Sequence, residues 1–376
     1  MPFPKRTEKL NEICQRLFKD AGININGKKP WDIQVNNMGF YRRCLQDASL
    51  GLGESYMDGW WDCERIDMLI TALIESDIKS SLSASYKDLL RVASSKLINF
   101  QSHKRAWIVG KEHYDLGNDL FSEMLDPWML YSCAYWKNAT NLDAAQENKL
   151  KLICEKLQLK EGMSLLDIGC GWGGVSEYAA RNYNVKVTGI TISNEQRKLA
   201  QKRCADLDVE ILLMDYRDLN KKFDRIVSVG MFEHVGPKNY KNFFDVVTRC
   251  LVKEGVFLLH TIGSNRTDAS VDPWINKYIF PNGCIPSLGQ ISLASEKSFI
   301  IEDLHNFGSD YDLTLMAWYR RFYSSWPKLS DKYSERFKRM FTFYLNACAG
   351  AFRARDLQLW QICFTKGLKG GIIVPR

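Results

Sequence analysis

The sequence predicts an α/β fold, with a doubly wound parallel sheet and a smaller, mainly helical N-terminal domain. Three observations lead to this fold class. From Gly162 onward, short apolar runs alternate with stretches of helical periodicity; a glycine-rich loop follows the first of these runs; and the first hundred residues carry helical stripes. Alternating strands and helices build a parallel sheet with helices on both faces. A chain of 376 residues suits one large and one smaller domain.

The N-terminal helical domain is expected to span residues 1–112. Lys9–Phe18 and Tyr86–Phe100 both place apolar residues at helical spacing. The second stripe is interleaved with basic residues, a pattern found in helices that touch membranes, although such a helix can equally pack its apolar face inward. Between them, the glycine- and aromatic-rich stretch 50–61 predicts a turn or short helix at an interface. The boundary to the next domain is expected near residues 112–120.

The second domain, residues 113–376, is expected to hold the sheet. Its five buried strands are predicted at Ser164–Ile168, Val185–Ile190, Val209–Leu213, Arg225–Val229 and Val256–Leu259. Helices are predicted between them at Gly173–Asn182, Ser193–Asp206 and Lys238–Val252. Ser193 and Gln196 have the spacing of a capping box, which places a helix start directly after the second strand.

Composition and charge exclude several classes of protein. The eleven cysteines include no C-x-x-C pair, which is typical of reduced thiols in a cytosolic protein. No apolar run has the length of a signal peptide or a membrane span, and no His/Cys/Asp cluster has zinc spacing, so we expect no metal. The net charge is +7, but residues 320–376 alone carry twelve basic against three acidic side chains. This basic tail and the basic stretch Tyr86–Lys111 suit phosphate-bearing partners, unless they are simply solvated faces.

The strongest motif is the loop after the first predicted strand, Leu165-Leu-Asp-Ile-Gly-Cys-Gly-Trp-Gly-Gly174. Glycines at a strand-to-helix turn let the backbone approach a ligand closely. Asp167, Gly169, Gly171 and Gly173 depart from the dinucleotide fingerprint. They resemble the first motif of class I S-adenosylmethionine-dependent methyltransferases. That resemblance implies a Rossmann-like fold and S-adenosylmethionine as methyl donor.

The same resemblance implies further cofactor contacts beyond the glycine loop. The second strand of many such enzymes ends in an acid that holds the ribose, whereas here neutral side chains take that place. After the third strand, Asp215-Tyr-Arg217 suits the adenine amino group and ring. The implied cofactor residues outside the glycine loop are Tyr131, Ser132, Thr191, Ser193, Gln196, Asp215 and Tyr216.

Motifs throughout the chain resemble the cyclopropane-fatty-acyl-phospholipid synthase family. They are Gly51-Leu-Gly-Glu-Ser-Tyr-Met-Asp-Gly-Trp60, Lys111–Asp119, Tyr131–Trp136, Gly230–Gly236, His260–Gly263, Asp272–Pro281, His305–Tyr311 and Asn346–Phe352. Segments that follow the fourth and fifth strands share one crevice at the carboxyl ends of a parallel sheet. Glu233, His260 and the glycine loop are therefore expected in one cleft.

This resemblance implies transfer of a methylene group from S-adenosylmethionine to the cis double bond of an unsaturated acyl chain in a membrane phospholipid. In that family a bound bicarbonate ion is the proposed base. The implied bicarbonate pocket here consists of Cys133, Glu233, His260 and Tyr311, with a backbone contact from Ile262. Aromatic faces would stabilise the carbocation-like centre. The family also designates a cysteine that matches Cys348 as an active-site residue, although small neighbours such as Ala347 and Gly350 indicate helix packing there.

Partners and alternatives follow from these features. We expect an anionic phospholipid membrane surface as docking partner, a homodimer, no nucleic acid, and a cytoplasmic protein peripherally associated with the inner face of the membrane. A related alternative is a fatty-acid methyltransferase that makes a methyl-branched product. A nucleic-acid methyltransferase is a rival of a different class, favoured by the basic tail but without a recognition module. A non-catalytic lipid-binding protein would not need the intact loop and Glu233.

Overall fold

The structure is a computed structural model that describes residues 6–76, 117–267 and 271–376. The predicted helix Tyr86–Phe100, the basic stretch Tyr86–Lys111 and most of the expected boundary region lie outside the described residues. The described chain forms two compact units. The first comprises residues 6–76, 271–281 and 315–357, and the second comprises 117–267, 282–314 and 358–376. Two later segments thus join the N-terminal residues in one unit, while the boundary at 112–113 stays a prediction.

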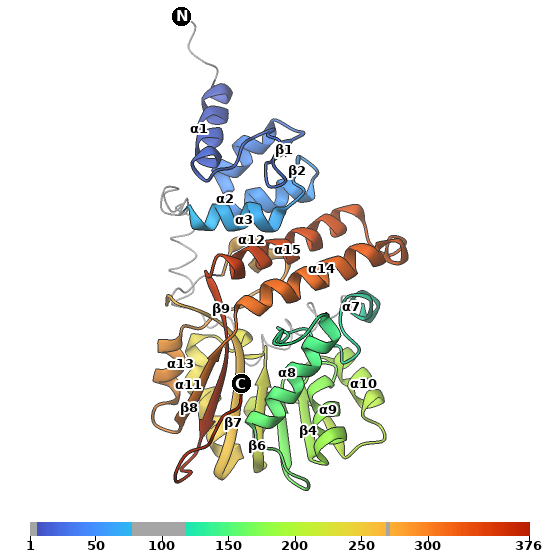
Figure 1. Ribbon diagram of the computed structural model, residues 1–376, viewed down its shortest axis with the longest axis vertical. Helices are drawn as coiled ribbons and strands as arrows, with labels where there is room; N and C mark the ends of the chain where they lie inside the picture. Colours follow the sequence, from blue (N-terminus) through green and yellow to red (C-terminus); the bar gives the residue numbers. More distant parts are fainter. Residues whose placement is uncertain (1–5, 77–116, 268–270) are drawn as a thin grey trace, which may run out of the picture. The chain divides into compact units, whose positions relative to one another are not determined.

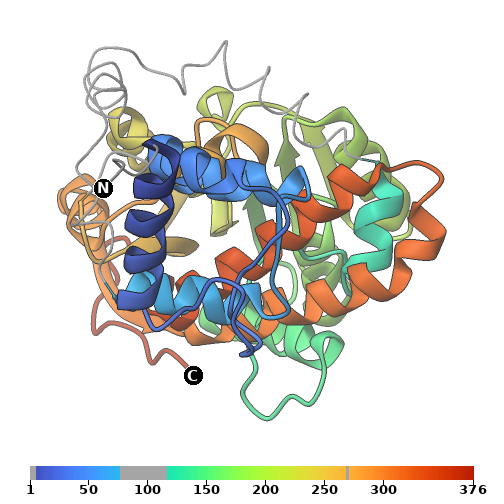
Figure 2. The same ribbon diagram turned by 90° about the horizontal axis from the view of Figure 1, so that it is seen from above.

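The first unit is mainly helical, as the sequence predicts. Its elements are α1 (Arg6–Asp20), β1 (Gln34–Val35), α2 (Gly39–Met57), β2 (Trp61–Asp62), α3 (Ile66–Glu75), α12 (Pro273–Tyr278), most of α14 (Ser309–Leu329) and α15 (Glu335–Arg353). The blue helices α1 to α3 can be followed in Figures 1 and 2. An aromatic cluster at its centre joins Trp61 to Phe40, Tyr56 and Phe343, with ring centroids 4.9 to 6.3 Å apart.

The glycine-rich stretch 50–61 takes one of its two predicted forms, a short helix packed at an interface, which follows a break at Ala48. Most of it is the last part of the long helix α2, which is interrupted only once, at Ala48 with φ 46°. Its glycines serve packing instead of a turn: a Cβ at Gly51 would lie 2.2 Å from the Arg43 carbonyl oxygen, and one at Gly53 would lie 2.4 Å from the Trp274 ring. Close packing has therefore overridden the low helix propensity of glycine.

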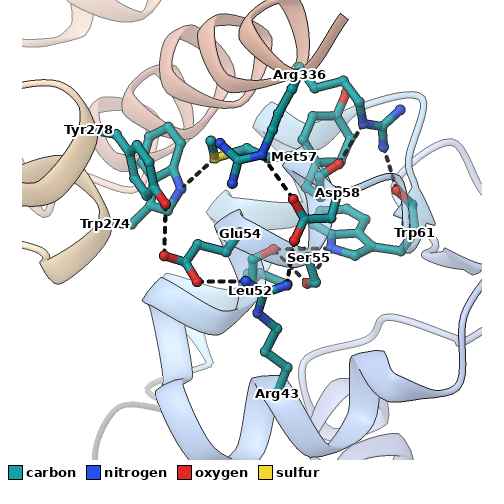
Figure 3. A network of polar contacts seen from close by, with 12 residues as sticks. Arg43, Leu52, Glu54, Ser55, Met57, Asp58, Trp61, Trp274, Tyr278 and Arg336 are labelled. Atoms are coloured by element: carbon teal, nitrogen blue, oxygen red, sulfur yellow. Dashed lines mark hydrogen bonds and ion pairs between the residues drawn. The ribbon is translucent and has the colours of Figure 1, made fainter.

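A polar network surrounds this stretch (Figure 3), and we call it saturated because both oxygens of Glu54 and both oxygens of Asp58 have partners. Glu54 accepts hydrogen bonds from Lys277 Nζ (2.6 Å) and Tyr278 OH (2.8 Å) on one oxygen and from Arg43 (2.7 Å) on the other. Asp58 pairs with Arg43 and Arg336. Burial raises the pKa of Glu54, but the hydrogen bonds from Lys277, Arg43 and Tyr278 outweigh it and bring that pKa down to about 2. Glu54 is thus an ionised structural anchor.

The second unit contains the seven-stranded sheet. The strands are β3 (Ser164–Ile168), β4 (Lys186–Thr191), β5 (Val209–Leu213), β6 (Phe223–Val229), β7 (Leu251–Ser264), β8 (Ile300–Asn306) and β9 (Leu357–Thr365). Their order is β5-β4-β3-β6-β7-β9-β8. Strands β3 to β7 pair in parallel, and β8 pairs antiparallel with β9. All five predicted strands are present, and β7 extends well beyond its predicted range.

Helices cover both faces of this sheet (Figure 1). The helical elements are α7 (Asn118–Met124), α8 (Leu142–Lys156), α9 (Gly174–Tyr183), α10 (Asn194–Arg203), α11 (Tyr240–Cys250), α13 (Leu288–Ser295) and the short turns η1 (Tyr216–Asp218), η2 (Phe232–His234) and η3 (Pro237–Asn239). Alternate strand residues enter opposite cores: Leu166 packs with α11 and α13, and its neighbour Leu165 packs with α8 and α9. The sheet is therefore doubly wound, as predicted.

The cysteines are distributed through both units as free thiols. Eight of the eleven are buried, and Cys63, Cys284 and Cys348 are partly exposed. Burial raises the pKa of Cys133 well above its usual value and that of Cys204 to about 11. These two thiols are therefore protonated at neutral pH, as expected of small core residues.

Candidate active site

The glycine loop lies at the point where the strand order of the sheet reverses. β3 has β4 on one side and β6 on the other, and ligands of doubly wound sheets bind at such a switch point, beyond the carboxyl ends of the strands. The loop after β3 bends through three glycines with positive φ: Gly169 at 81°, Gly171 at 54° and Gly173 at 84°. Side chains rarely adopt these angles, which explains the glycine requirement.

The three glycines differ in their surroundings. A Cβ at Gly169 would come within 2.7 Å of Met231, and one at Gly173 within 3.0 Å of Ala200. A Cβ at Gly171 would meet no described atom within 4 Å. Space beside a backbone that no side chain fills suits a ligand lying against the loop. Helix α9 begins directly after the loop, and the N–H groups of its first turn have no partner within the helix.

Asp167 lies on β3, just before this loop. It is buried, and Ser176 in the first turns of α9 donates a hydrogen bond of 2.8 Å to its Oδ2. Burial raises the pKa of Asp167 to about 7. The carboxyl group therefore ties β3 to α9 and fixes the shape of the loop, and its contact with the cofactor stays a prediction.

The side chains predicted after β4 lie together. Thr191 donates to Gln196 Oε1 at 2.8 Å, and Ser193 caps α10 by accepting from the Gln196 backbone N–H at 3.3 Å. The predicted capping box is therefore half formed, because the Gln196 side chain turns to Thr191 and not back to the Ser193 backbone. After β5, Asp215 accepts two hydrogen bonds from the Arg217 guanidinium (2.8 and 2.9 Å), which lies 5.3 Å from the Tyr216 ring centroid.

Glu233 sits in η2, directly after β6, and is buried. Its Oε1 accepts a hydrogen bond of 2.7 Å from the Ile262 backbone N–H at the end of β7. Its Oε2 is buried and has no hydrogen-bond partner in the described part of the chain. Burial raises the pKa of Glu233 to about 7. A buried carboxyl oxygen without a partner is costly, which marks this position as a candidate ligand site.

His260 lies on β7, two residues before Ile262. Gln361 Nε2 on β9 lies 3.3 Å from its Nδ1, while its Nε2 is buried and lacks a partner among residues 6–76, 117–267 and 271–376. Burial, together with the charges of Lys149 and Lys156, holds the pKa of His260 well below its usual value, so the ring is neutral. If the Gln361 amide donates to Nδ1, the ring proton lies on Nε2.

Cys133 lies next to the start of α14. Its thiol lies 4.0 Å from Thr314 Oγ1, which also accepts hydrogen bonds from the Ala134 backbone (3.1 Å) and from Trp136 Nε1 (2.9 Å). Tyr311 is buried one turn before Thr314. Phe307, just ahead of α14, packs against the His260 ring at 5.8 Å. The loop 131–136, the start of α14 and the end of β7 therefore converge within the second unit.

The loop that carries Tyr131 and Ser132 is held by α8. Gln146 Nε2 donates to the Leu130 and Ser132 carbonyl oxygens at 3.3 and 3.0 Å. Lys149 Nζ donates to Ser132 Oγ at 2.7 Å. The sequence motifs do not single out Lys149, Thr314 or Gln361. A polar side chain at an apolar position of a buried element is the signal that could have found Lys149 and Gln361.

Cys348 belongs to the first unit. It lies on α15, where a Cβ at Gly350 would come within 2.6 Å of the Asp67 carbonyl oxygen on α3. This confirms the close helix packing expected from its small neighbours. Burial raises the pKa of Cys348 to about 12, so its thiol keeps its proton at neutral pH.

None of the described helices is both long and apolar enough to cross a membrane. In the same residues, no group of three or more His, Cys, Asp or Glu side chains is arranged to hold a metal ion.

Comparisons with known proteins identify relatives of this chain. Cyclopropane-fatty-acyl-phospholipid synthase of Escherichia coli K12 is 66% identical over 364 residues, covering 97% of this chain and 95% of that protein. Cyclopropane mycolic acid synthase 1 of Mycobacterium tuberculosis is 35% identical over 273 residues, covering 68% of this chain and 95% of that protein. The crystal structure of mycolic acid cyclopropane synthase CmaA1 complexed with SAH and CTAB superposes with a TM-score of 0.65 at 32% identity, covering 69% of this chain and 98% of that one.

The family model described as mycolic acid cyclopropane synthetase matches residues 101–362. This range includes the glycine loop, Glu233, His260 and the start of α14. The match and the relatives together show that the chain belongs to this family of cyclopropane synthases.

Proposed function

We propose that the chain is a cyclopropane-fatty-acyl-phospholipid synthase. It transfers a methylene group from S-adenosylmethionine to the cis double bond of an unsaturated acyl chain in a membrane phospholipid. The observation that carries this proposal is the 66% identity to the Escherichia coli enzyme, which extends over 97% of the chain. The mycolic acid relative, in contrast, covers only 68% of it.

The reaction makes two demands on the protein. The alkene attacks the methyl carbon, the carbon–sulfur bond breaks, and S-adenosylhomocysteine leaves as the thioether. The resulting cation closes to a cyclopropane when the former methyl group loses one proton. A site for this chemistry must hold the sulfonium near the alkene and must contain an acceptor for that proton.

The glycine loop fits the methyl donor. Gly171 leaves space beside the backbone, and the residues after β4 and β5 offer hydroxyl, amide and carboxylate groups at the same edge of the sheet. We propose that Tyr131, Ser132, Asp167, Gly169, Gly171, Gly173, Thr191, Ser193, Gln196, Asp215 and Tyr216 form this site.

The buried groups around Glu233 fit a small anion such as bicarbonate. Glu233 Oε2 can accept a hydrogen bond and His260 Nε2 can donate one, and neither has a partner within the described residues. Bicarbonate carries both an O–H group and acceptor oxygens, so it could satisfy both atoms; when bound, it would supply the base. Glu233, fixed by the Ile262 N–H, would orient it, with Cys133 and Tyr311 completing the pocket. Cys348 would serve packing instead.

Radiolabelled methyl transfer tests the activity. Purified protein, S-adenosylmethionine and vesicles of anionic phospholipid with oleoyl chains should give label in the lipid fraction and a cyclopropane product in mass spectrometry. A methyl-branched product would favour the fatty-acid methyltransferase alternative. Label in added RNA with none in the lipid would overturn the proposal.

We infer that the enzyme docks on anionic membrane surfaces, on the inner face of the cytoplasmic membrane. The substrate chain lies in a bilayer, and α14 exposes Arg320 and Lys328 together with Tyr323, which is 54% exposed. The same hypothesis includes Arg321, which is half-buried, and Lys87, Arg91 and Lys96, which lie outside the described residues. Each basic residue near an anionic surface contributes about 1 kcal/mol.

Co-sedimentation with vesicles tests this docking. Arg320→Gln combined with Lys328→Gln should weaken binding to anionic vesicles about 30-fold at low salt, since the loss is about 2 kcal/mol. Lys160→Gln with Lys186→Gln, two exposed lysines of the second unit, removes the same charge and should change binding less. Equal binding to neutral and anionic vesicles would contradict the proposal.

We also propose that the protein is a homodimer. Sedimentation velocity of the purified protein without vesicles tests this.

A further inference from the structure

Helix α8 buries two lysines on one face. Lys149 and Lys156 are seven residues apart, and both are fully buried. Residues spaced by seven lie on the same side of an α-helix, so both amines point into the second unit. Fully buried lysines are rare, because removing the ammonium from water is costly unless charge and hydrogen bonds compensate. Each of the two therefore needs a physical reason.

The two amines have different partners. Lys156 Nζ lies 3.1 Å from His305 Nδ1 and 3.8 Å from Asp303, an ion pair that accounts for its charge. Lys149 Nζ donates to the Ser132 hydroxyl at 2.7 Å, and this is its one hydrogen bond in the described part of the chain. An ammonium group has three N–H donors, so two of them remain available to a ligand or to water.

Lys149 acts on the loop that carries the implied donor and bicarbonate residues. Together with Gln146, which donates to the Ser132 carbonyl, it fixes both the side chain and the backbone of Ser132. Cys133 follows directly, and Ala134 is fixed to Thr314 at the other end of the loop. Hydrogen bonds thus hold one end of the loop to α8 and the other end to α14.

Few charged and titratable groups face Lys149 within the described residues. They are Asp126 before the loop, Cys133 in it and His260 on β7, with Lys156 further along the same helix. Both Asp126 oxygens already accept backbone hydrogen bonds, from Trp128 (2.9 Å) and Leu130 (3.0 Å). Neutral Cys133 and neutral His260 provide no positive charge, and neither does Glu233. The side chains implied for the anion pocket therefore include no cation.

We propose that Lys149 is a positioning residue that holds the Ser132–Cys133 loop in place and supplies the buried positive charge that balances the bound anion. This inference rests on the proposed function and names a residue that the family resemblance did not. An anion in a low-dielectric site is stabilised by a nearby cation far more than by one in water. The two remaining N–H donors of Lys149 are left for water molecules, through which its charge can act on the anion.

The first test replaces the charge. Lys149→Met retains much of the volume and removes the ammonium, and we expect the bicarbonate concentration for half-maximal methyl transfer to rise at least about tenfold. Lys149→Arg should bring this bicarbonate concentration back to within about threefold of the value for the unmodified protein. Lys156→Met is the matched control: it removes an equally buried lysine from the same helix. It should lower the melting temperature while changing the half-activating bicarbonate concentration less than about twofold.

The second test uses the unmodified protein and does not depend on a variant that folds. Burial lowers the pKa of Lys149 to about 8. Cys133 keeps its proton in this range, because burial raises the pKa of that thiol well above its usual value. The half-activating bicarbonate concentration should therefore rise from roughly pH 7.5 to 9.5, as Lys149 loses its proton, by up to about tenfold per pH unit. Lys149→Arg should remove this rise, because the guanidinium keeps its charge, and should leave only the small change near pH 7.5 that comes from Glu233, whose pKa is about 7.

The outcomes separate this inference from the proposed function. If the unmodified protein transfers methyl groups without any response to added bicarbonate, the proposed anion site is wrong. If bicarbonate activates the unmodified protein, but its profile is flat with pH and Lys149→Met responds like Lys156→Met, only the role of Lys149 is overturned. Calorimetric titration with S-adenosylhomocysteine shows whether a variant still folds around its donor site.

Discussion

Two glutamates, one in each unit, show how differently this molecule uses a carboxyl group. Glu54 in the first unit has charged or hydroxyl donors on both oxygens (Figure 3), and its pKa falls to about 2. Glu233 in the second unit accepts the Ile262 backbone N–H on one oxygen and has no described partner on the other, and burial raises its pKa to about 7. Where partners are complete, the carboxylate stabilises the fold; where they are missing, the fold carries a cost that a ligand can relieve.

The largest effect is expected from removing the charge of Glu233. Glu233→Gln keeps the shape of the side chain, and we expect kcat to fall by about 100- to 10,000-fold, the range for groups that position proton transfer. Affinity for S-adenosylhomocysteine should change less than about threefold, because the interaction matters chiefly in the transition state. Steady-state kinetics and calorimetry measure the two. Full activity of this variant, with and without bicarbonate, would contradict the assignment.

The same variant should be more stable than the unmodified protein at alkaline pH. The folded-state pKa of Glu233, about 7, lies above its usual value of 4.5. The protonated form is therefore favoured in the folded state, and this stability is lost as the pH rises from about 4.5 through 7. At about pH 8, without ligand, Glu233→Gln should gain up to about 3 kcal/mol. Urea unfolding on the acidic and the alkaline side of this range measures the gain, which a pH-independent difference would refute.

The glycine loop offers the next test of the ligand-binding unit. Gly171→Leu should weaken S-adenosylhomocysteine binding at least about 30-fold, because the side chain fills the space beside the backbone. Gly162 is a matched control, since it also has a positive φ, of 81°, and no described atom within 4 Å of the position that a Cβ would take. Gly162→Leu should cause similar backbone strain but leave binding intact. Equal loss of binding in both variants would mean that strain, and not occupation of the ligand space, explains the effect.

The smallest effect concerns the saturated network. Glu54→Gln should lower the free energy of unfolding by about 1–2 kcal/mol at neutral pH, a value reduced by the partial exposure of Arg43 and Lys277. Because the pKa of Glu54 is below its usual value of 4.5, this contribution is present above pH 4.5 and is lost as the pH falls toward 2. Glu335→Gln, in an exposed ion pair, should have no measurable effect. Thermal unfolding at neutral pH and at about pH 3.5 tests both.

The parallel part of the sheet could be predicted from sequence because its strands are short, mainly apolar runs bounded by glycine or polar residues. β3 and β5 agree with the prediction to the residue. The sequence does not predict β8, because this edge strand has exposed Ile300 and Ile301 and a polar second half. The sequence leaves the glycine stretch in α2 open between a turn and a short helix, because it does not show that Trp274, more than 200 residues later, packs against it.

The candidate site divides in the same way. Glu233 and His260 could be predicted to share a cleft from strand order alone, since each follows a parallel strand. Gln361 could not, because its approach to His260 depends on β9 inserting beside β7, out of sequence order. Lys149 has no local motif either: its partner Ser132 precedes it by seventeen residues and belongs to a loop.

The burial of the cysteines gives the molecule a built-in reporter of its own opening. A thiol that is enclosed and protonated reacts with an alkylating reagent only when the surrounding structure opens, so its labelling rate measures local unfolding. Cys133 lies at the implied anion pocket and Cys170 in the glycine loop, and both are buried. The labelling rate of Cys133 would therefore report opening around the anion pocket, and that of Cys170 would report opening around the glycine loop. Ligands that close the two regions together would slow both labelling rates in concert, and a ligand of one region alone would slow only one.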